Sequence, residues 1–471
     1  MIWLTQSGFK SATVNAPLTS FWKELLTLPG VGTYRFRGIE AHSMLRLLKK
    51  LRRNERGNVL ILAGMAMPLI IGSAGLAVDG IQWALWKRQL QRAADSAALA
   101  AVYAKVQGAS SQTPEEAVDY ELGIGATAGT RRNASGFALT AANRAVTVAT
   151  GTGYTNGSRV VLTVDQVPAF SSMFWPSMNI KAGATAATVE TGVYCVVSLI
   201  NTGATGITAS GNADINLGCG MITNSTSMDA AIATGNSEVF ATPVAAVGGI
   251  RSSDNWNGAE LLPFTVKQDD PFAGISPPPP TDYAAPCYDL SVGPQDTVNV
   301  AAPTTAGKVT CFSSLHVQGN LTLAPGTYVI NGGDVSANSG AKLSCTGCTF
   351  ILTNSNSDTS AAIGDVDFNG GAEIKISAST TGTYKDILFY QDRRASSGTN
   401  TINGNSNSTF SGAMYFPKQL LRINGTSDLT FSCAQFVAWQ VEFSGNTDIV
   451  NTCSTGYGTR RVMGRHVRLV A

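Results

Sequence analysis

Residues 52–103 read RRNERGNVLILAGMAMPLIIGSAGLAVDGIQWALWKRQLQRAADSAALAAVY, and this stretch decides how the chain is organised. A basic cluster is followed by twenty uncharged residues at 59–78 and then by an alanine-rich segment. A helix of this length, rising about 1.5 Å per residue, matches the ~30 Å hydrocarbon core of a bilayer. A buried core helix is one alternative, and a signal peptide, whose apolar part is only about 7 to 15 residues long, is another. The pattern predicts a single membrane span.

Positive charge is concentrated on the N-terminal side of this span. Residues 44–57 contain only one acid, Glu55, and six cations: Arg46, Lys49, Lys50, Arg52, Arg53 and Arg56. After the span, Asp79 precedes the first cation, Lys87. Short loops rich in Lys and Arg stay in the cytoplasm, so we expect residues 1–57 to be cytoplasmic and the chain after Asp79 to be exported. This topology predicts a single-pass membrane protein with an exported C-terminal domain.

The segment before Met44 shows no convincing core pattern. Residues 44–57, MLRLLKKLRRNERG, are a far more usual opening for a membrane anchor. One hypothesis is that the protein starts at Met44, and the other is that residues 1–43 form a short cytoplasmic extension. Detection by mass spectrometry of any peptide from residues 1–40 would exclude the first hypothesis.

The helix is expected to continue beyond the membrane, over residues 58–106. Neither Gly nor Pro occurs between Gly80 and Gly108, and Ala and Leu are strong helix formers. Apolar and small residues recur there at spacings of three and four, which places them on one face of a helix: Trp83, Trp86, Leu90, Ala94, Ala97, Ala101 and Ala104. We expect the four alanines of this stripe to face a helix of a partner subunit.

Residues 55–101, ERGNVLILAGMAMPLIIGSAGLAVDGIQWALWKRQLQRAADSAALAA, combine a basic start, a span that ends in residues 75–79 (GLAVD), and a patterned helix after it. The patterned positions are Leu90, Gln91, Ala93, Ala94, Asp95, Ala97, Ala98, Leu99 and Ala100. This segment resembles the N-terminus of the Tad (tight adherence) pilus-assembly family, in its TadG-like branch. The resemblance implies a bitopic, non-catalytic component of a Tad/Flp-type pilus-assembly or secretion apparatus. It also implies contacts with membrane lipid and with inner-membrane and pilus-assembly subunits, and it leaves homo-oligomerisation open. The location that it implies is the inner membrane, with the C-terminal domain periplasmic or at the cell surface.

Two features found in that family are missing from the sequence. Many TadG-like proteins carry a von Willebrand A domain with an Asp-x-Ser-x-Ser metal site, whereas the nearest string, residues 334–338, ends in asparagine. Pilin-like relatives have glutamate five residues after the glycine at which the leader is cut, and counted from Gly57 this position is Leu62. We expect neither a metal nor any other cofactor.

Residues 107–192 are predicted to form a small α+β module. Thr113, followed by Pro114 and two acids, is a helix start, and this helix should end near Leu122. Alternating or β-branched apolar residues predict strands at 145–150, 159–167 and 179–190. Residues 170–175, FSSMFW, form a compact aromatic cluster without recognisable chemistry.

From Val193 onward, short hydrophobic alternations end in Asn-Gly, Gly-Asn or Gly-Gly pairs, as at 315–320 and 441–446. Short strands with such regular turns indicate a sandwich or a solenoid. The recurrence favours a solenoid, and we expect residues 193–471 to form a right-handed parallel β-helix. The Pro-rich segment 251–286 cannot supply ladder donors and should be an insertion across its face. The expected fold class is mainly β, with an N-terminal transmembrane helix.

All eight cysteines follow the span: Cys195, Cys219, Cys287, Cys311, Cys345, Cys348, Cys433 and Cys453. An even number of cysteines, all in the exported part, predicts disulfides in an oxidising compartment. Pairing in sequence order is the simplest hypothesis among the 105 connectivities that eight cysteines allow.

Catalytic and metal-binding motifs are weak. The Cys345–Cys348 pair fits a redox motif, half a zinc site or a disulfide across a turn, and its strand-like flanks favour the disulfide. Residues 365–370, DVDFNG, imitate half of a calcium loop, but the twelfth position is Ile376 and a solenoid strand explains the alternation equally well. His316 should be a surface residue. No nucleophile elbow, phosphate-binding loop or His-Glu-x-x-His motif occurs.

Three functions are therefore carried forward. The first is the pilus-assembly component, without catalysis. The second is a membrane-anchored β-helix adhesin or glycan-binding protein, and the third is a polysaccharide-degrading β-helix enzyme. Nucleic acid is not an expected partner, because the net charge is only +2 and the cations cluster beside the membrane.

Overall fold

The computed structural model describes residues 58–107, 112–125, 136–305, 307–358, 360–425, 429–446, 448–453 and 460–470. The predicted cytoplasmic segment 1–57 and the alternative start at Met44 lie outside these residues. The chain divides into two compact units, Met1–Asp79 and Gly80–Ala471. It is mainly β with one long apolar helix near the N-terminus, as the sequence predicts.

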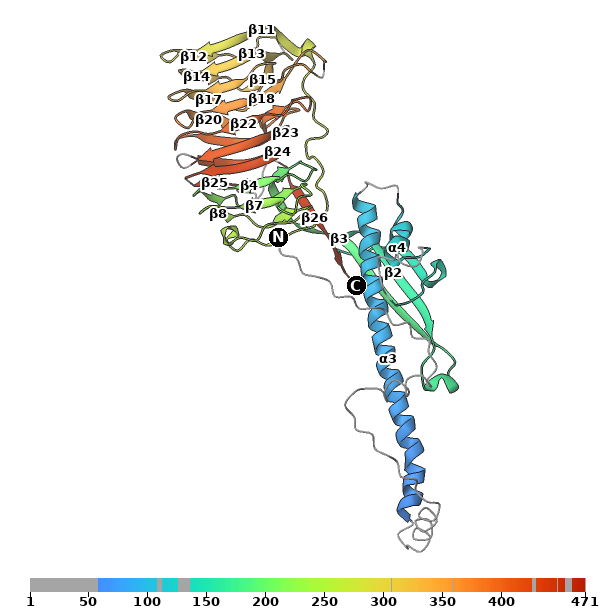
Figure 1. The fold of residues 1–471 in the computed structure, drawn as a ribbon. Helices are drawn as coiled ribbons and strands as arrows, with labels where there is room; N and C mark the ends of the chain where they lie inside the picture. The colour runs from blue at the N-terminus through green and yellow to red at the C-terminus, as the bar shows by residue number, and fades with distance from the viewer. Residues whose placement is uncertain are drawn as a thin grey trace, which may run out of the picture. The chain divides into compact units, whose positions relative to one another are not determined.

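The long helix, α3 (Asn58–Gln107), is continuous (Figure 1). Only Pro68 interrupts its backbone hydrogen-bond pattern, and proline is tolerated in membrane-spanning helices. Its continuation after Gly80 confirms the prediction from alanine and leucine content.

A small α+β module follows α3. Helix α4 (Pro114–Leu122) begins with a capping box, in which the Thr113 hydroxyl accepts a hydrogen bond from the Glu116 backbone N–H at 3.2 Å and the Glu116 carboxylate accepts one from the Thr113 N–H at 2.8 Å. Strands β1 (Arg144–Ala149), β2 (Thr155–Gln166) and β3 (Met178–Ser198) form an antiparallel meander. Short 3₁₀ turns lie at Ala141–Asn143 and Ser171–Met173. These elements confirm the predicted helix and three strands.

Strand β3 does not stop at the predicted boundary between residues 192 and 193. Its first half pairs antiparallel with β2, and its C-terminal residues, from Tyr194 to Ser198, pair in parallel with later strands. The last strand of the chain, β26 (Val462–Leu469), pairs antiparallel with the middle of β3. A single strand therefore connects the module to the rest of the β structure.

The remaining strands are short and mostly parallel. The first group is β4 (Ile207–Ala209), β5 (Asp214–Asn216), β6 (Gly220–Thr223), β7 (Ala231–Ala233), β8 (Glu238–Phe240), β9 (Val244–Ala246) and β10 (Leu261–Leu262). The second group is β11 (Tyr283–Val292), β12 (Thr297–Val300), β13 (Val309–Val317), β14 (Asn320–Leu323), β15 (Gly326–Asn331), β16 (Val335–Ala337), β17 (Lys342–Thr346), β18 (Cys348–Thr353), β19 (Val366–Phe368), β20 (Glu373–Ser377), β21 (Ile387–Gln391), β22 (Thr399–Ile402), β23 (Thr409–Gly425), β24 (Leu429–Gly445) and β25 (Ile449–Thr452). Through most of both groups, each strand pairs in parallel with the third strand after it, for example β3 with β6 and β14 with β17. The result is three parallel ladders around an apolar interior.

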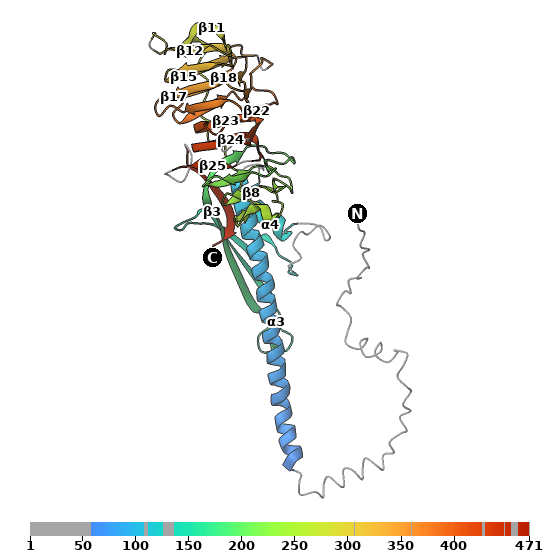
Figure 2. The same ribbon diagram turned by 90° about the vertical axis from the view of Figure 1, so that its left-hand side faces the viewer.

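The order of the turns in this stack differs from their order in the chain. Strand β24 pairs with β3 and β4, and β25 pairs with β5, so the last turn of the second group lies on the first turn of the first group. Figure 1 shows the red strands β24 and β25 next to the green β4, with the yellow β11 at one end of the stack, and Figure 2 shows the same order from the side. The chain thus enters the stack in its interior, at a seam between β24 and β3.

The crossover segment (residues 263–282) carries the chain from β10 to β11, at the far end of the stack. It is narrower than the predicted insertion 251–286, because β10 and the start of β11 lie within that range. The segment lies on the outer face of one ladder, where residues in register on successive strands form an apolar row: Val329, Ile351, Tyr390, Tyr415, Val437, Val197 and Ile222. Phe272 and Tyr283 pack in the same cluster.

Side-chain hydrogen bonds attach the crossover segment to the stack. The Tyr415 hydroxyl donates to the Asp270 carboxylate at 2.6 Å, and the Tyr390 hydroxyl donates to the Ile275 carbonyl at 2.8 Å. The Arg393 guanidinium donates to the Phe272 and Ile275 carbonyls at 2.6 and 2.8 Å. The crossover segment therefore covers an apolar sheet face that would otherwise be exposed.

Inside the stack, aromatic rings lie on one another from turn to turn. The ring centroids of Phe312, Tyr328, Phe350 and Phe389 follow at 6.0, 5.7 and 5.3 Å. Such pairs contribute roughly 0.5–1.5 kcal/mol each beyond the burial of their area. We therefore assign these stacked aromatic side chains a role in stability and not in a functional site.

Candidate membrane-anchoring site

The first half of α3 exposes large apolar side chains, whose contact with water is thermodynamically unfavourable. Six large side chains of the unit Met1–Asp79 are between 63 and 75% exposed: Leu62, Met65, Met67, Leu69, Ile70 and Ile71. An exposed apolar surface of this extent marks a membrane or protein contact. Within the described part of the chain, one helix, α3, is long and apolar enough to cross a membrane.

The alanine stripe of α3 lies in a different environment from the predicted one. Ala94, Ala97 and Ala101 are fully buried in the core of the module, together with Val160 and Leu162 of β2. The facing residues of β3 are Ile180, Ala182, Ala184 and Ala186, which alternate along the strand and so share one face. Small residues on both elements allow the helix to pack closely on the sheet.

The predicted partner-helix face is therefore wrong for three of its four residues. Ala94, Ala97 and Ala101 contact the chain's own sheet, and Ala104 is half-buried. A stripe at helical spacing indicates that one face is buried, but it carries no information about what covers that face. Trp83, earlier on the stripe, remains 43% exposed.

Polar contacts fix the position of the helix along the sheet. The Gln91 side-chain amide donates to the Gly183 carbonyl of β3 at 2.9 Å and to the Asp95 carboxylate at 2.8 Å. The Lys105 ammonium donates to the Gly157 carbonyl of β2 at 3.2 Å. The Tyr103 hydroxyl donates to the Phe264 carbonyl at 3.1 Å, and burial raises the pKa of this tyrosine. The helix from Leu90 to Lys105 is thus held in one register on the module.

The structure shows the surroundings of the calcium-like segment and of His316. Val366 and Phe368 of β19 are buried on either side of the exposed Asp367, so the calcium-like alternation is a strand. Burial raises the pKa of Asp365. His316 is half-buried, and its Nδ1 lies 2.8 Å from the Ser336 hydroxyl. No group of three or more His, Cys, Asp or Glu side chains converges as a metal site among the residues described.

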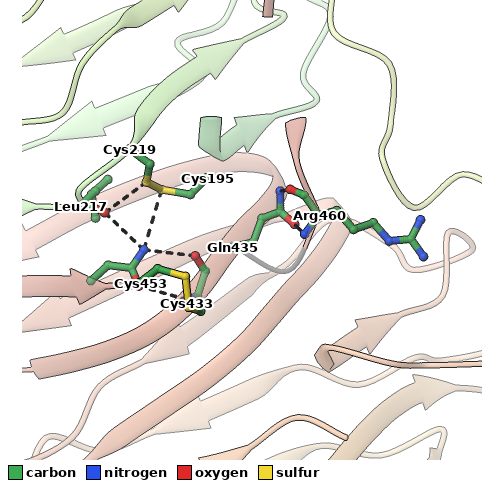
Figure 3. The surroundings of a disulfide bond; sticks show 9 residues. Cys195, Leu217, Cys219, Cys433, Gln435, Cys453 and Arg460 are labelled. Atoms are coloured by element: carbon green, nitrogen blue, oxygen red, sulfur yellow. Dashed lines mark hydrogen bonds between the residues drawn. A yellow bond between two sulfur atoms is a disulfide. The ribbon is translucent and has the colours of Figure 1, made fainter. Parts of the chain in front are cut away.

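The eight cysteines pair in sequence order: Cys195 with Cys219, Cys287 with Cys311, Cys345 with Cys348, and Cys433 with Cys453. The short Cys345–Cys348 loop turns at Gly347, whose φ of +79° favours glycine. Figure 3 shows the Cys195–Cys219 and Cys433–Cys453 bonds close together. They lie on the two sides of the seam, because β24 and β25 stack there on β3 and β5.

A buried asparagine at the seam was not singled out by the sequence. Asn451 of β25 donates from its side-chain amide to the Ala434 carbonyl at 3.2 Å and to the Leu217 carbonyl at 3.4 Å. Its side-chain oxygen accepts from the Ala434 N–H at 3.0 Å. Asparagine is too frequent in the turns of this chain for one interior copy to be recognised from its type alone.

The sequence of the aromatic cluster at 170–175 does not indicate a function for it. In the structure it belongs to the turn between β2 and β3, and Phe170, Phe174 and Trp175 are more than half exposed. The signal that distinguishes it from core residues is the absence of a regular alternation.

Comparison with known proteins finds a similar family for the N-terminal part of the chain alone. Neither the curated proteins nor the solved structures contain a match to this chain. A family model described as putative Flp pilus-assembly TadE/G-like matches residues 57–107, almost the same residues as α3. The segment that forms the long apolar helix is therefore the part of the chain that is similar to the Flp pilus-assembly TadE/G-like family.

Proposed function

We propose that this protein is a bitopic membrane component of a Tad/Flp-type pilus-assembly or secretion apparatus. The observation that carries the proposal is that one helix both matches the family model and exposes a membrane-length apolar surface. The basic residues before the span support a cytoplasmic N-terminus in the inner membrane and an exported C-terminal unit.

The proposal includes a role without catalysis. The exported unit acts through its surface, as a spacer or docking domain for pilus-assembly subunits. We further infer that its parallel ladders form a right-handed β-helix, and the pairing of strands with the third strand after them supports this. Release of reducing ends from polysaccharides by the purified protein would contradict the non-catalytic role.

A deletion strain complemented with variants tests the function. The wild-type gene should restore surface pili, whereas Leu69→Arg with Ile70→Arg should not, because each arginine near the centre of a span costs about 2.5–3.5 kcal/mol of insertion free energy. Leu69→Val with Ile70→Val is the matched control and should restore pili. Normal pili in the deletion strain would overturn the proposal.

The orientation has its own test. Protease added to spheroplasts should digest the chain after Ala101 and spare residues before Asn58. Protection of the large C-terminal fragment in sealed cells without an outer membrane would reverse the proposed topology. A pull-down from membranes, with subunits identified by mass spectrometry, would name the partners.

A second candidate function, glycan binding, is favoured by a cavity of about 310 Å³ beside the crossover segment. Its lining combines Pro277–Pro280 and Tyr283 with the polar Asn354, Asp392 and Arg394. Burial acts to raise the pKa of Asp392, but hydrogen bonds from the Arg394 guanidinium, at 2.9 Å, from the Arg394 backbone N–H and from the Thr353 hydroxyl together hold this pKa below its ordinary value. Binding of polysaccharides that is lost in Arg394→Ala would favour this function.

A further inference from the structure

The turn between β2 and β3 presents an unusual apolar surface. Five of its side chains are between 55 and 83% exposed: Val167, Phe170, Met173, Phe174 and Trp175. Single exposed apolar residues are common on protein surfaces, but a group of five on one turn marks a contact with a membrane or another protein. We call residues 167–177 the aromatic turn.

Contacts with α3 determine the level of this turn along the helix. The Lys87 ammonium donates to the Lys181 carbonyl, and the Gln91 amide donates to the Gly183 carbonyl at 2.9 Å, so residue numbers increase in the same direction along α3 and β3. Met178, where β3 begins, is three residues before Lys181, a distance of about 10 Å along a strand. About seven helical residues cover the same distance, which brings the start of β3 to the level of Gly80.

Gly80 also follows the membrane span in the sequence. The uncharged run ends at Val78, and Asp79 is the first charge after it. The aromatic turn precedes Met178 and therefore lies near the level of Gly80, two residues after the uncharged run ends. Arg88 and Lys181, which follow Gly80 and Met178 along α3 and β3, are exposed cations. Figure 1 shows β2 and β3 running beside α3 to this turn.

We propose that the aromatic turn is a second membrane contact, which inserts into the interface of the same bilayer that α3 spans. The inference rests on the proposed function in one respect, namely that α3 is a membrane span. Phe170, Met173 and Phe174 enter the boundary between headgroups and acyl chains. Trp175 has the amphipathic ring that is enriched at this level of membrane proteins. Two attachment points, the helix and the turn, fix the rotation and tilt of the exported module relative to the membrane surface.

Fluorescent labels on the full-length protein test this contact. Met173→Cys, Ile70→Cys and Val148→Cys are each labelled with an environment-sensitive dye, without reductant, since all eight native cysteines are paired. Ile70 reports on the span, and Val148, 74% exposed on β1, is the control outside the turn. The labelled proteins are reconstituted into vesicles of phosphatidylethanolamine and phosphatidylglycerol that contain a lipid with a nitroxide near the headgroup or at the end of the acyl chain.

The expected result is that the shallow nitroxide quenches the Met173 label severalfold more than the Val148 label, and that the Ile70 label is quenched most by the deep nitroxide. Quenching at Ile70 without quenching at Met173 overturns the aromatic-turn inference and leaves the span intact. Lack of quenching at Ile70 overturns the proposed span itself. A Met173 label in an apolar environment without lipid quenching assigns the turn to a protein partner, which also overturns the inference.

A second variant excludes an effect of the label. Phe174→Ser with Trp175→Ser should leave the melting temperature unchanged, since both side chains are exposed, and should reduce quenching at Met173 to the level of Val148. Val167→Ser alone, at the edge of the turn, should retain most of the quenching. Unchanged quenching in the double variant would show that the two aromatic side chains do not hold the turn in the membrane and would overturn the proposal.

Discussion

The hydroxyl of Ser198 donates a hydrogen bond to the carbonyl oxygen of Trp439 at 2.9 Å, across 241 residues of chain. This contact lies at the seam, where Val197 of β3 pairs in register with Val437 of β24. The first turns of the stack to be synthesised are therefore completed only by the last ones. We expect the parallel-stranded region to unfold as one cooperative unit, since neither group of turns has a finished end without the other.

Asn451 should contribute strongly to the seam. Asn451→Ala removes the partner of the buried Ala434 N–H, and an unsatisfied buried donor costs about 1–3 kcal/mol. We expect the free energy of unfolding, measured with denaturant on the full-length protein in detergent, to fall by about 2 kcal/mol. Asn338→Ala, at an exposed position, is the control and should change it by less than about 0.5 kcal/mol. Equal effects of the two changes would contradict a special role for Asn451.

The Cys433–Cys453 disulfide should stabilise the stack beside the seam. Its sequence separation is 20, against 3 for Cys345–Cys348, and in the chain-entropy model these loops correspond to about 3 and about 2 kcal/mol. Replacing Cys433 and Cys453 with alanine should lower the melting temperature more than replacing Cys345 and Cys348. Melting curves that do not change under reduction would disprove the dependence on disulfides.

The alanine stripe should tolerate no enlargement. Ala97→Leu with Ala101→Leu forces larger side chains between α3 and β3, and overpacking of a core typically costs about 1–3 kcal/mol. We expect a lower melting temperature and reduced steady-state protein levels in membranes. Ala84→Leu, at an exposed position of the same helix, is the matched control. Normal protein levels combined with loss of pilus formation would instead indicate that the stripe contacts a partner subunit.

Alkaline pH should loosen the crossover segment. Burial raises the pKa of Tyr390 to about 12 from an ordinary value of 10.0, and burial together with the hydrogen bond to Asp270 raises the pKa of Tyr415 further. The folded state then holds these protons more tightly than the unfolded state. The resulting stability is complete below pH 10 and is lost as the pH rises toward 12.

The measurement compares unfolding free energies across that range. Two pH units at one tyrosine correspond to about 2 to 3 kcal/mol, so the wild type should lose stability more steeply than Tyr390→Phe between pH 10 and about 12. Tyr120→Phe, at a tyrosine that is 55% exposed, serves as the control and should follow the wild type. Identical slopes for the wild type and Tyr390→Phe would show that this tyrosine does not ionise on unfolding.

The sequence by itself determined the features that depend on near neighbours. The uncharged run and the alanine-rich continuation specified α3, and Thr113 with Glu116 specified the start of α4. Alternation specified the strands of the module and the buried positions of segments such as Val366–Phe368. These signals are local, because helix propensity, capping and face alternation act over a few residues.

Only the tertiary structure decided which surfaces meet. The periodicity of α3 marked a buried face, but not that β2 and β3 of the same chain cover it. Strand patterns indicated short strands with regular turns, but not that β24 pairs with β3 or that residues 263–282 cross to the far end. The apolar rows of neighbouring turns are so similar that they do not specify which strand pairs with which. Strand pairing therefore depends on long-range packing and on the chain's connections, which no local sequence pattern predicts.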